Sequence, residues 1–130
     1  MTALRIIPIR SLAVLAYMAA LLALTTLPGR QVARLGFSGT LLDLAHIPLF
    51  TGLTLVTLWA VVGPRAPRLT LVVVAIVAFA AVDEWLQHFA PGRVPSLADF
   101  VRDVLGVGIG VALAEASRPL VLAFRKESQR

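Results

Sequence analysis

Two neighbouring carboxylates interrupt the most apolar part of this chain. Residues 69–82 form an almost unbroken apolar run of 14 residues, which continues directly into Asp83 and Glu84. As a helix, this run is about 21 Å long, whereas the hydrocarbon core of a bilayer is about 30 Å thick. A helix that crosses the bilayer must therefore continue through both acids. Because charges within a membrane are costly, Asp83 and Glu84 are candidates for a functional site.

The composition of the chain also favours a membrane protein. Of its 130 residues, 58% are hydrophobic and 15% are charged. A soluble domain is typically about half apolar and about a quarter charged, and so small a core could not bury this much apolar surface. The absence of cysteine excludes disulfides and thiol catalysis. The net charge of +5 comes from basic residues near the expected helix ends, so it indicates membrane topology and no nucleic acid partner.

Proline and glycine residues divide the chain into four predicted membrane-spanning helices. These cover approximately residues 11–27, 42–62, 69–89 and 97–123. Continuous apolar stretches of about 20 residues fit helices, because the strands of a membrane barrel alternate between apolar and polar residues. The sequence therefore predicts one all-α domain over residues 1–130, folded as a four-transmembrane-helix bundle.

The basic residues predict which end of this bundle faces the cytoplasm. With four spans, both termini and the loop between the second and third spans share one face. That face carries eight of the 12 basic residues and two acids, whereas the opposite face carries four basic residues and five acids. The positive-inside rule therefore predicts cytoplasmic termini. A cleaved signal peptide is the alternative for the first segment, although no clear Ala-x-Ala site follows it.

Polar residues from three predicted spans gather at the opposite, outer boundary. They are Asp43 and His46 in the second span, Asp83, Glu84 and Gln87 in the third, Arg93 in the following loop, and Asp99 and Asp103 in the fourth. Members three or four residues apart in one span share a face of the helix. This convergence predicts a common site that binds a ligand.

Several members of this set also have structural interpretations. Asp43 can be the N-cap of its helix, and Ser96-x-x-Asp99 matches a capping box. Neighbours on a helix point about 100° apart, so Asp83 can lean toward the membrane interface while Glu84 faces the bundle.

Glu84 has the strongest need for a partner among these residues. In a poorly solvated site, the expected partners are Arg93, His46 or a bound proton. Glu84 and His46 are also the candidates for acid/base catalysis. A metal site would use Asp43, His46 and either Glu84 or Asp99, but no metal-binding motif is present, and we expect neither a metal nor another cofactor.

Glycine residues in the fourth predicted span indicate helix packing. Gly106 and Gly110 form a small-x-x-x-small face, which lets another helix approach closely. The spacing does not indicate a nucleotide site, because no strand precedes it.

Three segments resemble, in order, motifs of the VanZ-like family of small bacterial membrane proteins. They are residues 43–46 (Asp-Leu-Ala-His), residues 83–93, which begin Asp-Glu and end Pro-Gly-Arg, and residues 96–106, which begin Ser-Leu-Ala-Asp. The family usually has an aromatic residue in place of Ile47 and an Asn in place of Asp103. The resemblance implies a multi-pass protein of the bacterial inner membrane. The family's namesake is linked to resistance to the glycopeptide teicoplanin, but the resemblance implies no settled biochemical activity.

Three functions from different classes fit these observations. The first, which we favour, is binding of a polar or phosphate-bearing head group, such as that of a lipid-linked envelope precursor, with a charge-assisted contact from Arg93. The second is an enzyme that acts on a lipid-linked substrate through Glu84 and His46. The third is a proton or cation transporter, which the apolar middle of each predicted helix disfavours. The expected partners are membrane lipids and such a precursor, and a homo-oligomer remains open.

Overall fold

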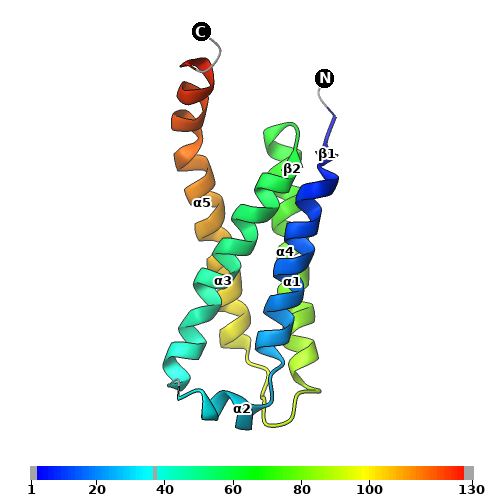
Figure 1. Cartoon of the computed structure of the whole chain (residues 1–130), viewed down its shortest axis with the longest axis vertical. Helices are drawn as coiled ribbons and strands as arrows, with labels where there is room; N and C mark the ends of the chain where they lie inside the picture. Colours follow the sequence, from blue (N-terminus) through cyan, green and yellow to red (C-terminus); the bar gives the residue numbers. More distant parts are fainter. Residues whose placement is uncertain (1–2, 37, 128–130) are drawn as a thin grey trace.

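Four long helices run side by side along the long axis of the molecule (Figure 1). The computed structural model describes residues 3–36 and 38–127. The long helices are α1 (Pro8–Thr25), α3 (Gly39–Ala60), α4 (Arg65–Gln87) and α5 (Leu97–Glu127). A short helix, α2 (Gly29–Arg34), lies across the lower end in Figure 1, together with the α4–α5 connection. We call this the α2 end.

Both termini and the α3–α4 connection lie at the opposite end of the molecule, which we call the termini end (Figure 1). A short antiparallel ladder at this end joins β1 (Arg5–Ile6) to β2 (Val61–Val62). The sequence did not predict this ladder or α2, because segments of two and six residues are too short to show a period.

Three of the helices are long and apolar enough to cross a membrane. They are α1 with 18 residues, α3 with 22 and α4 with 23, or about 27 to 35 Å of helix. They overlap the predicted spans 11–27, 42–62 and 69–89. The fourth predicted span, 97–123, coincides with α5, which has 31 residues but is less apolar than the other three. The structure is thus mostly helical, with three candidate spans among the described residues.

Local signals set the start of each helix. Pro8 opens α1, where its fixed φ and missing N–H cost nothing. The Ser38 side chain accepts a hydrogen bond of 3.2 Å from the Leu41 N–H and so caps α3. The predicted N-cap role of Asp43 is therefore wrong, because α3 begins four residues earlier than Asp43.

The most extensive helix contact among the described residues is between α3 and α5, and it depends on two glycines. A Cβ atom on Gly106 would lie 2.5 Å from the Ile47 carbonyl oxygen, and one on Gly110 would lie 2.7 Å from Thr54 Cβ. No atom lies within 4 Å of the corresponding position at Gly108. The Thr51 hydroxyl also donates a 3.0 Å hydrogen bond to the Gly106 carbonyl. The face of Gly106 and Gly110 therefore lies against α3, whereas Gly108 faces away.

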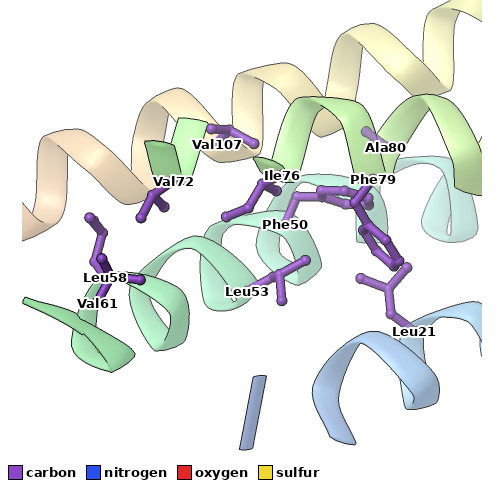
Figure 2. Close-up of a cluster of buried hydrophobic side chains, with 10 residues drawn as sticks. All are labelled: Leu21, Phe50, Leu53, Leu58, Val61, Val72, Ile76, Phe79, Ala80 and Val107. Carbon is purple, nitrogen blue, oxygen red and sulfur yellow. The ribbon is translucent and has the colours of Figure 1, made fainter. Parts of the chain in front are cut away.

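Apolar side chains fill the middle of the bundle (Figure 2). Phe50 and Leu53 from α3 meet Ile76 and Phe79 from α4, and the rings of Phe50 and Phe79 lie 6.1 Å apart between centroids. Leu21 adds α1 to this cluster, so the core joins the helices along their middle. The polar residues predicted to form a site lie beyond this core, toward the α2 end.

Candidate functional site

The buried ionisable side chains among the described residues lie toward the α2 end. Asp83 and Asp103 have no exposed surface, and Glu84 is 8% exposed. A buried carboxylate is costly unless hydrogen bonds, an opposite charge or a metal ion stabilise it. The contacts of each carboxylate therefore indicate what this part of the molecule is built to do.

Asp103 of α5 meets His46 of α3. The His46 Nδ1 and Asp103 Oδ1 atoms are 2.8 Å apart. Gly106 lies one helical turn after Asp103 and packs on Ile47, so the close approach of the two helices brings this pair together. One potential ligand atom from each of His46, Glu84 and Asp103 lies within 4.8 Å of the others. The structure thus brings His46, one of the partners expected for Glu84, close to it.

Glu84 joins the end of α4 to the beginning of α5. Its Oε2 atom accepts a 2.9 Å hydrogen bond from the Ser96 N–H, directly before α5, and the Gln87 amide approaches Oε1 at 3.5 Å. The carboxylate therefore lies at a helix N-terminus, where the helix dipole favours negative charge. In a capping box, an acid within the same helix accepts this N–H. Here Glu84 takes that place, so the capping-box carboxylate predicted at Asp99 is wrong.

Asp99 instead bonds to the guanidinium of Arg102, one turn further along α5. Its backbone N–H approaches the Ser96 hydroxyl at 3.4 Å, so Ser96 retains its capping role. Asp99 is half-buried and its charge is compensated.

Asp83 faces α1 and not the membrane interface, so the predicted orientation of this side chain is wrong. The Thr25 hydroxyl donates a 2.6 Å hydrogen bond to Asp83 Oδ1. The angle between neighbours on a helix lets Asp83 face α1 while Glu84 faces α5. The sequence analysis missed Thr25, because a threonine in an apolar helix can also bond to its own backbone, as Thr25 does to Leu21. The position of Thr25 at the end of an apolar span was the one feature of the sequence that could have indicated its contact with a polar residue.

Arg93 is held by the chain that follows α1. Its Nε–H donates a 3.2 Å hydrogen bond to the Leu27 carbonyl. A backbone contact between the two segments accompanies this approach: the Gly29 N–H donates to the Pro91 carbonyl at 3.0 Å, and the neighbouring Gly92 has a φ of 76°. A side chain at Gly29 would collide with the Gly92 carbonyl. Among the hydrogen bonds of the described residues, the contacts of Glu84 come from Ser96 and Gln87 and not from Arg93.

A pocket of about 420 Å³ opens beside these residues. Most of its wall is apolar and comes from α1, α2 and α3, including Leu24, Val32 and Leu49. Its polar part contains five of the predicted site residues: Asp43, His46, Gln87, Arg93 and Asp99. Asp83, Glu84 and Asp103 are buried outside this wall. The predicted set therefore divides into a group that lines the pocket and a group that is buried. His46 connects the two groups, because it lines the pocket and also contacts Asp103.

Comparison with known proteins finds no matching family model, no matching curated protein and no matching solved structure. The resemblance to VanZ-like proteins therefore depends on the three sequence motifs alone. A function for this chain has to be argued from the pocket and from the buried carboxylates beside it.

Proposed function

We propose that this chain is a VanZ-like, multi-pass protein of the bacterial inner membrane that binds the head group of a lipid or of a lipid-linked envelope precursor. The mixed lining of the pocket at the α2 end carries this proposal. An apolar wall with a few convergent polar groups is typical of ligand sites, and about 300–1,000 Å³ is their usual volume. A lipid combines the same two chemistries in one molecule. The family resemblance extends the proposal to a link with teicoplanin resistance.

Arg93 is the anchor that we assign to a phosphate or other anionic group. Its Nε–H is used by Leu27, which fixes the side chain at the wall of the pocket. A guanidinium carries five N–H donors in a planar fork, so its outer edge remains suited to two phosphate oxygens. Gln87 and His46 on the same wall offer further donors to the polar part of the ligand.

We assign the fourth membrane span to α5, although its charges make it less apolar than the other long helices. Those charges have partners: Asp99 bonds to Arg102, Asp103 meets His46, and Glu115 lies 2.5 Å from Arg65. Pairing lowers the cost of holding charged groups at the boundaries of a membrane. The packing of the Gly106 and Gly110 face of α5 against α3 supports the same placement, because it aligns α5 with a helix that is itself long and apolar enough to span.

The orientation in our proposal puts the pocket at the outer face of the membrane. The termini end carries most of the basic residues, so the positive-inside rule favours the cytoplasm for it. The α2 end then faces the periplasmic side, where an envelope precursor is used. The proposed ligand would enter from the outer leaflet, with its hydrocarbon part along α2 and the start of α3.

A membrane-embedded enzyme is the second candidate, favoured by the buried contacts of one pocket residue. His46 lines the pocket, and Asp103 holds its ring at 2.8 Å with Glu84 nearby. A histidine oriented by a carboxylate can act as a general base toward a bound substrate. This hypothesis assumes the same class of ligand, a lipid-linked molecule, but the protein would also convert it chemically.

A proton or cation transporter is the third candidate, and the core argues against it. Transport needs polar groups along the whole path through the membrane. Among the described residues, the buried ionisable side chains gather at one end, and the apolar cluster of Figure 2 fills the middle.

Photo-crosslinking tests the binding proposal directly. A photoreactive residue at Leu41, which lines the pocket, should label a phosphate-bearing lipid or precursor in native membranes. The matched control is Val74 of α4, which is more exposed (62% against 53%) but lies outside the pocket wall. Arg93→Gln should greatly reduce the labelling from position 41 and leave that from position 74 unchanged. The same species labelled from both positions, insensitive to Arg93→Gln, would show that the pocket has no selective ligand.

A further inference from the structure

We propose that His46, Glu84 and Asp103 bind a divalent transition-metal ion next to the pocket. The three side chains come from three different helices, α3, α4 and α5, and one ligand atom from each lies within 4.8 Å of the others. An imidazole and two carboxylates are donors that zinc and similar ions accept. This inference does not depend on the proposed lipid ligand, because the three residues can bind an ion in the absence of any lipid.

The three ligand atoms are near enough to one another to meet on one ion after a small movement. Nitrogen and oxygen ligands lie about 2.0–2.2 Å from zinc in a tetrahedral arrangement, which separates two of them by about 3.4 Å. The three atoms lie within 4.8 Å of one another, so the widest pair has to close by up to about 1.4 Å. We assign this closure to rotation of the Glu84 side chain, which is the longest of the three.

The strongest sign of a ligand is a buried oxygen atom that lacks a partner. Asp103 has no exposed surface, and its Oδ2 atom has no hydrogen-bond partner among the described residues. The other oxygen of this carboxylate contacts His46 at 2.8 Å, so the group as a whole points into the cluster. Carboxylate oxygens that are buried in this way are normally hydrogen-bonded or bound to a metal ion.

The charges around the cluster also favour a cation. The Oδ2 atom of Asp83 is also buried without a hydrogen-bond partner in the described part of the chain. The like charges of Asp83 and Asp103 repel each other when both are ionised. Neither of the two nearby guanidinium groups bonds directly to these carboxylates: among the described residues, Arg93 contacts the Leu27 carbonyl and Arg102 contacts Asp99. Even a protonated His46 leaves negative charge in excess when all three carboxylates are ionised. A divalent cation bound between the three side chains would compensate this excess of negative charge.

The donor set selects the class of ion. Magnesium and calcium prefer oxygen ligands alone, whereas imidazole favours zinc and its neighbours in the transition series. The His46 Nδ1 and Asp103 Oδ1 atoms face each other at 2.8 Å, so a bound ion would take the place of the proton between them. His46 also lines the pocket, so an ion there would lie beside the place assigned to an anionic head group.

Metal analysis of the purified protein tests this inference with zinc itself as the probe. The full chain, carrying a tag without histidine, is stripped with a chelator, dialysed against Zn²⁺ in detergent and analysed for bound metal. We expect one zinc ion per chain, with affinity lowered at least about 100-fold in His46→Gln and in Asp103→Asn. The matched control is His88→Gln, which changes the exposed histidine of the chain and should bind zinc like the original.

A second measurement on the unaltered protein guards against variants that fail to fold. Bound zinc should protect His46, but not His88, from modification by diethyl pyrocarbonate, as located by mass spectrometry. Binding of zinc that persists in both cluster variants, or His46 modified equally with and without zinc, would overturn the inference. Absence of bound zinc in the unaltered protein would overturn it as well, and would leave the lipid-binding proposal to its own crosslinking test.

Discussion

The Thr25 hydroxyl of α1 donates a hydrogen bond of 2.6 Å to the carboxylate of Asp83 in α4, which has no exposed surface. The two residues are 58 positions apart in the chain, so the contact joins the end of the first helix to the end of the third long helix. A buried acceptor depends on its donor, because water cannot replace it. This relationship makes Thr25 a structural part of the α2 end, although it is not a member of the predicted polar set.

We expect Thr25→Val to destabilise the protein. The substitution keeps the shape of the side chain and removes the donor of the Asp83 hydrogen bond, at a cost of about 1–3 kcal/mol in the free energy of unfolding. The measurement is reversible unfolding in detergent. Thr54→Val is the matched control, because the buried Thr54 hydroxyl bonds to the Phe50 carbonyl of its own helix. Equal losses in the two variants would mean that the contact with Asp83 adds nothing.

Glu84→Ala should loosen the beginning of α5. The substitution leaves the Ser96 N–H without its 2.9 Å acceptor, and we expect its exchange with deuterium to accelerate about tenfold or more. Hydrogen exchange read by mass spectrometry over residues 93–97 measures this. In Glu84→Gln the amide oxygen can still accept the bond, so its exchange should stay near that of the original protein. An unchanged exchange rate of the Ser96 N–H in Glu84→Ala would show that Glu84 does not stabilise the beginning of α5.

Gly110→Ala should weaken the contact between α3 and α5. Its new methyl group would meet Thr54 at 2.7 Å, and the forced shift of two packed helices costs about 1–3 kcal/mol in the free energy of unfolding. Gly108→Ala is the control on the same helix, because nothing lies within 4 Å of the added atom. Alanine is a better helix former than glycine, so Gly108→Ala should be neutral or gain up to about 1 kcal/mol. Equal destabilisation by both changes would contradict this packing.

The long helices were predictable because their length and apolar character are properties of continuous segments. The predicted spans 11–27, 42–62 and 69–89 each overlap a helix that is long and apolar enough to cross a membrane. The ends were less predictable. Ser38 caps α3 four residues before the expected start at Leu42, because a polar turn can extend a helix beyond its apolar part.

The shared face of Asp43 and His46 was also predictable, but the face of Asp83 and the partners of Glu84 and Arg93 were not. Asp43 and His46 are one turn apart in the sequence, and both line the pocket. The sequence suggested Arg93, His46 or a bound proton as the partner of Glu84. In the structure the Ser96 N–H bonds to Glu84, whereas the Leu27 carbonyl accepts from Arg93. Helix periodicity places a side chain on a face, and only the packing of the helices decides which atom that face meets.

The orientation of the chain in the membrane can be tested with single cysteines, since the chain contains none. Gln31 of α2 and Ala66 at the termini end are both exposed. A maleimide that cannot cross membranes should label Gln31→Cys in intact spheroplasts, because the basic termini end should face the cytoplasm. Ala66→Cys should be labelled only after the spheroplasts are lysed, which also shows that its thiol is reactive. The reverse pattern would place the pocket on the cytoplasmic side, and a ligand taken from the outer leaflet would then be excluded.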